Sequence, residues 1–329
     1  MLRPLALTAC LALAPVTGLA QTLQGTTVPG KTVSAVVNVP PALRIDEAPL
    51  SSSDRLSREL GFGIAGTALG FQTRGAWLGT FVTGGGIAPD ISQGADHALR
   101  GAVAGYGFDW LGLSPFIGYG QGKSGLDDGV TETRIRSYFI GLGLSGETQR
   151  FRYGAAVYAG RSHNAISAPN ALTGETDHDG RILGISLSGS GIVWQSPTAD
   201  RAVDLRLRAD VLHHSTDAHD LTGLRGGSIA ERTATSTALR VELGMPMARG
   251  EVAFRPYLGL SSFGGTQDDI GFSLPGVSAQ FAAADVLTGN AVSIGSDFAM
   301  GGNGLKGRMD LSRDDAGQTM WNVNLGLAF

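Results

Sequence analysis

The chain has 329 residues, of which 50 are Gly, 42% are hydrophobic and 16% are charged, and its formal net charge is −4. Glycine at about twice its average frequency argues against a helical bundle, because each Gly inside a helix costs about 1 kcal/mol. The hydrophobic fraction is too high for a disordered chain. The weakly negative charge excludes the basic surface expected of a nucleic-acid-binding protein. The composition therefore predicts an all-β chain with no nucleic-acid partner.

The first twenty residues have the pattern of a Sec signal peptide. Arg3 supplies positive charge, residues 5–16 are mostly apolar, and Gly18 and Ala20 are the small residues before a cleavage site. Cleavage there would remove Cys10, the only cysteine of the chain, so the mature protein would fold without disulfides. A lipoprotein signal ending at Cys10 is the weaker alternative, because the apolar core before it is short.

Residues 21–72 differ in composition from the rest of the chain and show no sustained hydrophobic period. Four prolines interrupt the segment: Pro29, Pro40, Pro41 and Pro49. We interpret it as a linker or arm. A short helix is predicted to start within it, with Ser53 or Asp54 as its cap.

Beyond residue 73, apolar and polar residues alternate. The alternation is clearest in residues 203–211, 237–245, 305–311 and 321–329. A period of two gives a strand one apolar and one polar face. Because a soluble β-sandwich shows the same pattern, alternation alone does not separate a sandwich from a membrane barrel.

The lengths of the connections separate the two folds. Twelve strands are predicted, at residues 74–83, 98–108, 112–122, 132–144, 149–161, 179–194, 200–214, 232–246, 251–263, 286–299, 303–313 and 318–329. Long and short connections alternate between most of them, as in outer-membrane barrels with short periplasmic turns and long extracellular loops. Greek-key connections would scatter these lengths. We therefore predict a transmembrane antiparallel up-and-down β-barrel over residues 73–329, with long loops at about 162–178, 215–231 and 264–285.

Aromatic residues gather near the strand ends assigned to the periplasm, as expected of an interfacial girdle. These are Phe108, Trp110, Phe151, Trp194, Phe254 and Phe329. An even strand count leaves residues 61–69 outside the wall. Residues 51–70 are therefore expected in the barrel interior as a short helix or an extended plug, and a periplasmic segment or an extra strand are the alternatives.

The polar faces of the strands are predicted to line a wet lumen, where exposed ion pairs contribute about 0–1 kcal/mol each. The predicted lumen-lining residues are Asp204, Arg206, Arg208, Asp210, Arg240, Glu242, Arg255, Lys306, Arg308 and Asp310.

The C-terminal third resembles the β-domain of autotransporters. The resemblance rests on residues 254–261 (Phe-Arg-Pro-Tyr-Leu-Gly-Leu-Ser), on 292–298 followed by Gly304 and Leu305, and on a last strand ending in Phe329. It implies a twelve-stranded outer-membrane translocator with an N-terminal segment threading the pore. It also implies recognition by the barrel-assembly machinery through a terminal signal, assigned here to Trp321, Val323, Leu325, Leu327 and Phe329. Only about fifty residues separate Ala20 from the first strand, so we expect no sizeable passenger.

Catalytic and metal chemistry are less favoured. His178, His213, His214 and His219 lie near Asp residues, as metal ligands do, but solvated loops have the same composition. His214 with a nearby Ser would need to meet in space to form a hydrolase site. We therefore predict no enzymatic activity, no metal and no cofactor.

The predicted function is a pore or surface anchor in the bacterial outer membrane, reached after Sec export. The lipid of that membrane and the assembly machinery are the expected partners, and an extracellular partner is not identified. Two alternatives remain. One is a small diffusion pore, biased toward anions by Arg206, Arg208, Arg240, Arg255 and Arg308. The other is a binding or structural protein acting through its long loops.

Overall fold

The structure is a computed structural model. It describes residues 47–86, 95–108, 112–126, 130–148, 151–168, 174–198, 201–222, 227–274, 277–281, 288–301, 304–315 and 317–329. Several predicted features lie outside the described residues: the signal peptide, Pro29, Pro40 and Pro41 of the arm, and Trp110. None of the described helices is long and apolar enough to cross a membrane.

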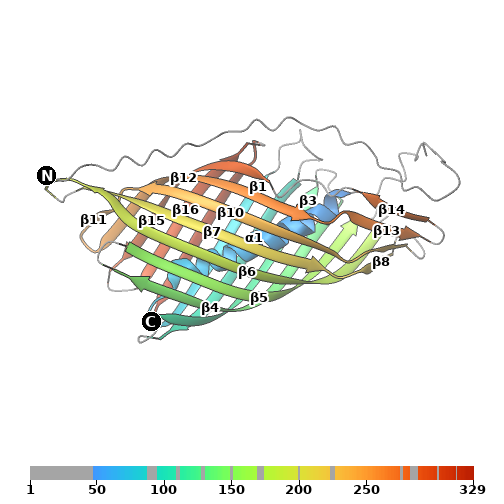
Figure 1. The fold of residues 1–329 in the computed structure, drawn as a ribbon, viewed down its shortest axis with the longest axis horizontal. Helices are drawn as coiled ribbons and strands as arrows, with labels where there is room; N and C mark the ends of the chain where they lie inside the picture. The colour runs from blue at the N-terminus through green and yellow to red at the C-terminus, as the bar shows by residue number, and fades with distance from the viewer. Residues whose placement is uncertain are drawn as a thin grey trace. The chain divides into compact units, whose positions relative to one another are not determined.

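Twelve antiparallel strands form a closed barrel (Figure 1). They are β1 (Gly75–Gly86), β2 (Ala95–Gly107), β3 (Leu113–Leu126), β4 (Glu132–Glu147), β5 (Phe151–Ala168), β6 (Gly174–Gln195), β7 (Ala202–Thr216), β10 (Arg232–Gly244), β12 (Val252–Gln267), β15 (Gly289–Met300), β16 (Leu305–Asp314) and β17 (Thr319–Ala328). Each strand pairs with the next, and the first pairs with the last, from Trp77 opposite Ala328 to Gly86 opposite Thr319. The predicted fold class, an up-and-down barrel of twelve strands, is confirmed.

The two ends of the barrel differ in their connections. At the turn end, the strands are joined by residues 108–112, 148–150, 196–201, 245–251 and 301–304, and β11 (Met247–Arg249) pairs with β12 there. At the loop end lie residues 87–94, 127–131, 169–173, 217–231, 268–288 and 315–318. The expected long loop at 162–178 is wrong, because β5 continues to Ala168 and β6 starts at Gly174.

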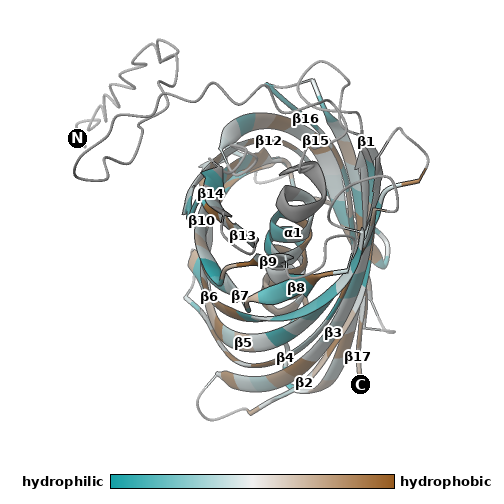
Figure 2. Cartoon of the chain, turned by 90° about the vertical axis from the view of Figure 1, so that its right-hand side faces the viewer, coloured by the Kyte–Doolittle hydropathy of each residue, from teal (hydrophilic) through white to brown (hydrophobic). Residues whose placement is uncertain are grey.

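A second, small sheet stands at the loop end and was not predicted. It consists of β8 (His219–Leu221), β9 (Gly227–Ile229), β13 (Ile270–Leu274) and β14 (Val277–Phe281), in the order β14-β13-β9-β8. Viewed from this end, β8, β9 and β13 lie across the mouth in front of the helix (Figure 2). The two longest connections, 217–231 and 268–288, therefore contain paired strands rather than loop alone.

The outer wall carries the apolar faces of the strands. On β10, Leu239 and Leu243 are about half exposed, whereas Glu242 between them is buried. On β12, Leu258 and Leu260 are exposed and Tyr257 is buried. Apolar side chains that face outward all along a closed wall match a barrel whose solvent is lipid.

A helix, α1 (Glu47–Phe71), runs through the barrel (Figures 1 and 2). It starts before the predicted caps Ser53 and Asp54, which lie inside it, and residues 61–69 are helical. One face of the helix is buried against the inner side of β1 to β7: Leu56, Leu60, Ile64, Ala65, Ala68 and Phe71. Burial of apolar surface stabilises by about 25 cal/mol per Å². This stabilisation offsets the low helix propensity of the glycines in α1.

Glycines on the facing strand make room for that apolar face. A Cβ added at Gly122, Gly120 or Gly118 of β3 would lie 3.2, 2.8 or 2.9 Å from an atom of α1. The helix residues met are Leu56, Leu60 and Ile64, in that order, each four positions after the last. The period of the helix thus matches the period of the strand, and α1 is a packed part of the core.

The inner wall on this side is apolar, which differs from the expected wet lumen. Trp77, Phe81, Phe116, Phe139 and Tyr158 are all almost fully buried around α1. The hydrophobic effect therefore acts inside the barrel as well as outside it.

This packing predicts that an engineered disulfide can join the helix to the wall. A Cβ at Gly61 would lie 2.0 Å from Leu212 Cδ1 and 3.5 Å from its Cγ, within reach of a disulfide after local adjustment. In a chain with Cys10 replaced, Gly61→Cys with Leu212→Cys should crosslink without added oxidant, detected by a gel shift on reduction. Gly70→Cys with Leu212→Cys is the matched control and should not crosslink. Equal crosslinking of the two pairs would contradict the placement of α1.

Candidate functional site: the barrel interior

The helix leaves a cavity of about 1510 Å³ on the side of the barrel away from its apolar face. The cavity wall includes Pro246 and Met247 at the turn end and Asp315 and Gln318 at the loop end. Arg55 and Arg74 line it from the two ends of the helical segment. The cavity therefore extends along α1 between the two ends of the barrel, with charged and apolar side chains in its wall.

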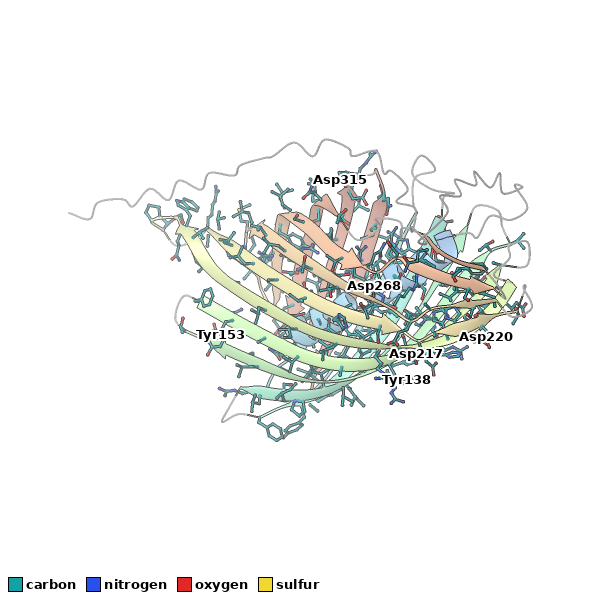
Figure 3. The ribbon with its side chains drawn as sticks, turned by 45° about the vertical axis from the view of Figure 1, so that its right-hand side comes forward. Tyr138, Tyr153, Asp217, Asp220, Asp268 and Asp315 are labelled. Atoms are coloured by element: carbon teal, nitrogen blue, oxygen red, sulfur yellow. The ribbon has the colours of Figure 1, made fainter. Side chains whose placement is uncertain are left out.

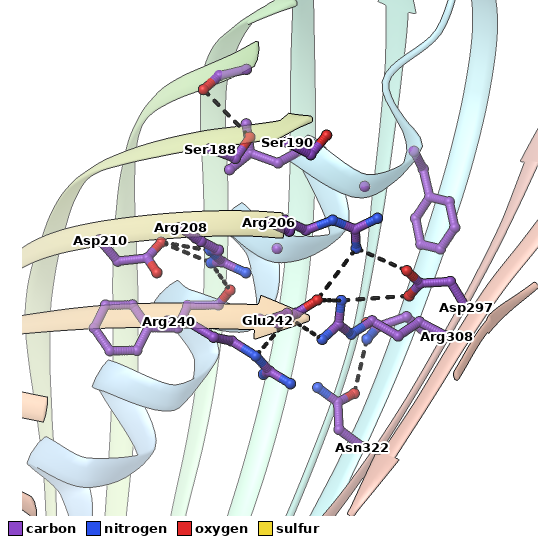
Figure 4. Close-up of a pocket in the computed structure, with 18 of the residues that line it drawn as sticks. Ser188, Ser190, Arg206, Arg208, Asp210, Arg240, Glu242, Asp297, Arg308 and Asn322 are labelled. Carbon is purple, nitrogen blue, oxygen red and sulfur yellow. Dashed lines mark hydrogen bonds and ion pairs between the residues drawn. The ribbon is translucent and has the colours of Figure 1, made fainter. Parts of the chain in front are cut away.

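Glu242 is the centre of the charged side chains in this cavity. It is 3% exposed, and Figure 4 shows Arg206 and Arg308 directed at it and at Asp297. Its carboxylate lies 2.5 Å from Arg308 Nη2, 2.8 Å from Arg240 Nε and 3.1 Å from Arg255 Nη1. Four different strands thus supply one buried carboxylate with its counter-charges.

The same arginines reach further carboxylates around the wall. Asp297 lies 2.9 Å from Arg206 Nη1 and 3.2 Å from Arg255 Nη1. Asp204 accepts hydrogen bonds from Arg255 Nε at 2.8 Å. The buried ring of Tyr257 lies beside the group, 4.5 Å from Arg308 Cζ, a geometry that favours a cation. Charges of both signs balance here, so the arginines do not form an open positive ring.

Arg208 joins this wall to the helix. Its Nη2 donates to the Phe62 carbonyl of α1 at 2.9 Å and to Asp210 Oδ1 at 2.8 Å. Ser186 donates to the same Asp210 oxygen at 2.5 Å. A Cβ at Gly66 would meet Arg208 Nη1, so a larger residue at this position would displace the guanidinium group from its present place.

At the loop end, buried histidines hold the acidic residues of α1. Asp54 lies 3.0 Å from His214 Nε2 and 3.1 Å from Arg232 Nη2. Glu59, one turn further, lies 3.2 Å from His97 Nε2 on the opposite wall. The helix is therefore held by charge at its first half and by apolar packing along its length.

The wall separates His213 from the other three histidines considered as metal ligands. His213 faces outward and contacts Thr235, whereas its neighbour His214 faces inward. His178 and His219 stack with ring centroids 4.2 Å apart. Burial lowers the pKa of His219, although the Asp217 carbonyl opposes this shift, so its ring is neutral at neutral pH. Among the described residues, no three His, Cys, Asp or Glu side chains are placed to hold a metal ion.

The structure brings most of the predicted lumen residues together. Nine of the ten line the cavity, and the tenth, Asp310, lies 3.3 Å from Arg240 Nη2. Sequence reasoning missed Asp297 and Tyr257. Asp297 stands on an inward position of β15, where alternation weakens because Gly295 and Ser296 precede it. Arg255 and Asp297 pair across β12 and β15, which a single strand cannot reveal.

The residues of the predicted assembly signal lie on β17 and at its end. Trp321, Leu325, Leu327 and Phe329 are exposed on the outer wall, and Val323 is half-buried. The other described girdle aromatics, Phe108, Phe151, Trp194 and Phe254, are also exposed and lie at the turn end.

We expect Phe329→Asp to impair assembly in the outer membrane while leaving export to the periplasm intact. The reason is that a charged Asp at the end of the chain cannot contact an apolar partner or lipid as Phe329 does. Heat-modifiable mobility and surface protease resistance measure assembly, and the periplasmic pool measures export. Phe263→Asp, with a half-buried aromatic at the loop end of β12, is the control and should keep most of its assembly. Normal mobility of the Phe329→Asp protein would contradict a terminal signal.

Known proteins resemble this chain in structure but not in sequence. No protein-family model matches this sequence, and no curated protein matches it. The translocator domain of the autotransporter NalP from Neisseria meningitidis is similar with a TM-score of 0.57, at 16% identity, over 86% of this chain and 98% of that one. The chain has the autotransporter β-domain fold. The transport unit of the autotransporter AIDA-I from Escherichia coli gives a TM-score of 0.58 at 11% identity over 86% of this chain and 98% of that one. The β-domain of the Bordetella autotransporter BrkA gives 0.50 at 16% identity over 77% and 97%.

Proposed function

We propose that the protein is an outer-membrane barrel that anchors its own N-terminal arm at the cell surface. The direction of α1 carries this proposal. Asp54 near its start contacts His214 and Arg232 at the loop end, and Gln72 just after it donates to the Leu144 carbonyl at the turn end. The helix therefore begins at the loop end, which is where we propose that the arm leaves the barrel. Because short turns of such barrels face the periplasm, that end faces the outside of the cell.

The helix that connects the arm to the wall is held too firmly to act as a loose plug. Its apolar face is buried, and Asp54, Glu59 and the Phe62 carbonyl each bond to the wall. The domain division that follows is a signal peptide over 1–20, an arm and helix over 21–72, and a barrel over 73–329. The similarity to two autotransporter translocator structures, which covers 86% of this chain, supports one barrel domain in this division.

Epitope tags on intact cells test the anchor. A tag placed within residues 21–46, or between Leu274 and Val277, should bind antibody without permeabilisation. The matched control is a tag between Met247 and Arg249 at the turn end, which should bind only after the outer membrane is opened. An arm tag that is detected only in permeabilised cells, while the barrel is assembled, would overturn the anchor.

A small diffusion pore is the second candidate, and the cavity beside α1 is the observation that favours it. Because Arg206, Arg240, Arg255 and Arg308 are paired with carboxylates, we expect weak charge selectivity rather than an anion channel. Single-channel recording of the full mature chain tests this: steady conductance supports the pore, and conductance only after removal of residues 21–72 supports the anchor alone.

We assign no enzymatic activity. The His214 imidazole, a possible base, bonds to Asp54, and no described Ser hydroxyl hydrogen-bonds to it. The expected partners are outer-membrane lipid and, through β17, the barrel-assembly machinery.

A further inference from the structure

The outer wall of β2 to β6 changes from apolar to basic at one level. On β4, the outward side chains Ile140 and Tyr138 are followed toward the loop end by Arg136 and Arg134. On β6, the outward side chains Ile185 and Leu183 are followed by Arg181. Figure 3 shows Tyr138 on the outer wall, away from the lumen. The level at which Arg replaces apolar residues marks the edge of the apolar band.

The first charged outward residue past this edge is an arginine on four of the five strands. We call these the arginine row: Arg100 on β2, Arg136 on β4, Arg161 on β5 and Arg181 on β6, all exposed. On β3 the same level holds Gln121, which is paired in register with Arg100 on one side and Arg136 on the other. Arg161 is directly opposite Arg181. Between β4 and β5 the row steps by two residues, because Arg136 is opposite His163 and Arg161 is opposite Tyr138. The row is therefore a strip with one step.

The four arginines of the row form no ion pair within the described part of the chain. The nearest outward carboxylates are engaged elsewhere: Glu132 pairs with Lys123 and Arg134, and Asp179 lies 2.9 Å from His163 Nδ1. No ion pair joins a described carboxylate to any of the four guanidinium groups. Like charges directly opposite each other on a sheet are destabilising, as Arg161 and Arg181 are. The strip thus presents guanidinium groups that an external anion can contact.

The turn end of the same strands has no such strip. There the outer wall ends in Leu144, Tyr153 and Phe151, and Figure 3 shows Tyr153 far along the wall from Tyr138. Arg152, the exposed arginine of this end of β5, pairs with Glu147 at 2.9 Å. On β2 to β6, the described arginines without an ion pair therefore lie only at the loop-end boundary of the apolar band.

We propose that the arginine row binds the phosphate groups of phosphorylated glycolipid in the outer leaflet. Guanidinium groups match phosphate oxygens in bidentate geometry. The exposed apolar side chains just below the row, Ile117, Ile140 and Leu183 among them, would contact the acyl chains of the same molecule. A soluble anion would use only the charges, whereas a lipid fills both surfaces. The assignment to the outer leaflet rests on the proposed orientation, with the loop end outside the cell.

The test measures retention of diphosphoryl lipid A by the immobilised, refolded mature protein in neutral detergent micelles. We expect Arg161→Gln with Arg181→Gln to weaken retention about tenfold, because the variant removes two charge-assisted contacts to phosphate and exposed contacts of this kind are weak. The matched control is Arg152→Gln with Arg249→Gln, which removes two exposed cations at the turn end and should keep wild-type retention. Heat-modifiable mobility shows that each variant is folded.

Two further measurements identify the ligand, one with a lipid that lacks phosphates and one with a soluble competitor. Lipid A stripped of its phosphates should not be retained, and millimolar inorganic phosphate should not displace the diphosphoryl form. Equal retention by the two double variants would overturn the arginine row as the site. Equal retention of the stripped lipid would reduce it to acyl contact, and displacement by phosphate would make it a site for soluble anions; both outcomes overturn the proposal. Micelles have no sidedness, so this result is independent of the surface-tag result that tests the anchor.

Discussion

Replacing Glu242 by Gln should lower the free energy of unfolding of the barrel by about 3–5 kcal/mol, the usual cost of breaking a buried ion pair. The side chain is 3% exposed and lies within 4 Å of four guanidinium groups. Gln would keep the shape and one acceptor oxygen, but it removes the negative charge on which those arginines converge. Urea titration of the protein in lipid vesicles, followed by tryptophan fluorescence, measures the change.

The control for this variant is Glu251→Gln, an exposed carboxylate in the turn before β12, where we expect a change within about 0.5 kcal/mol. Adding Arg308→Gln to Glu242→Gln should recover part of the loss, because it removes one uncompensated cation beside the Tyr257 ring. A loss below about 1 kcal/mol for Glu242→Gln would mean that water reaches the group, as the wet lumen expected from the sequence requires.

Most of the barrel wall could be predicted because its signal is local. Alternation along a strand depends only on which face meets lipid, so the strands now seen as β10 and β16 were placed within two residues at each end. The loop-end limits of β5 and β6 were missed by several residues. In the missed stretches outward side chains are polar, for example His163 and Asp177, and the apolar half of the alternation disappears.

The helix was harder to predict because its partners are distant in sequence. Gly61, Gly63, Gly66 and Gly70 lower the helix propensity of the segment, and the residues that stabilise it are on the wall. A Cβ at Gly63 would meet the Phe81 ring at 2.6 Å, so this Gly is required by a contact that only the fold shows. Helix propensity alone therefore underestimates α1.

The candidate site was predicted in part for the same reason. Inward positions follow from alternation, which placed Arg255 and Glu242 in the lumen. Their pairing with other residues does not follow from alternation. Arg255 binds Asp204, which is 51 residues away in the sequence, and their strands β12 and β7 are not neighbours in the wall. Such pairs depend on how the closed wall brings inward side chains of separate strands together, which the periodicity of a single strand does not contain.

Replacing two glycines of β3 by larger residues should displace α1 from the barrel wall. In Gly118→Leu with Gly120→Leu, the new side chains would occupy the space that Ile64 and Leu60 fill. Overpacking of this kind costs about 1–3 kcal/mol per site, and it falls on the contact that holds α1 rather than on the pairing of the wall. We therefore expect the barrel to assemble while the helix leaves its seat, so that single-channel conductance rises toward that of the chain lacking residues 21–72.

Gly125→Leu on the same strand is the control, because a Cβ there meets nothing within 4 Å, and its conductance should match the wild type. Truncating the helix side chains in the double variant, by Leu60→Ala with Ile64→Ala, should reseat the helix and lower the conductance again, since the displaced volume is returned. Rescue of this kind distinguishes a steric fit from general damage to the wall. If the double variant conducts like the wild type and keeps the crosslink between positions 61 and 212, the glycines of β3 do not determine where the helix sits.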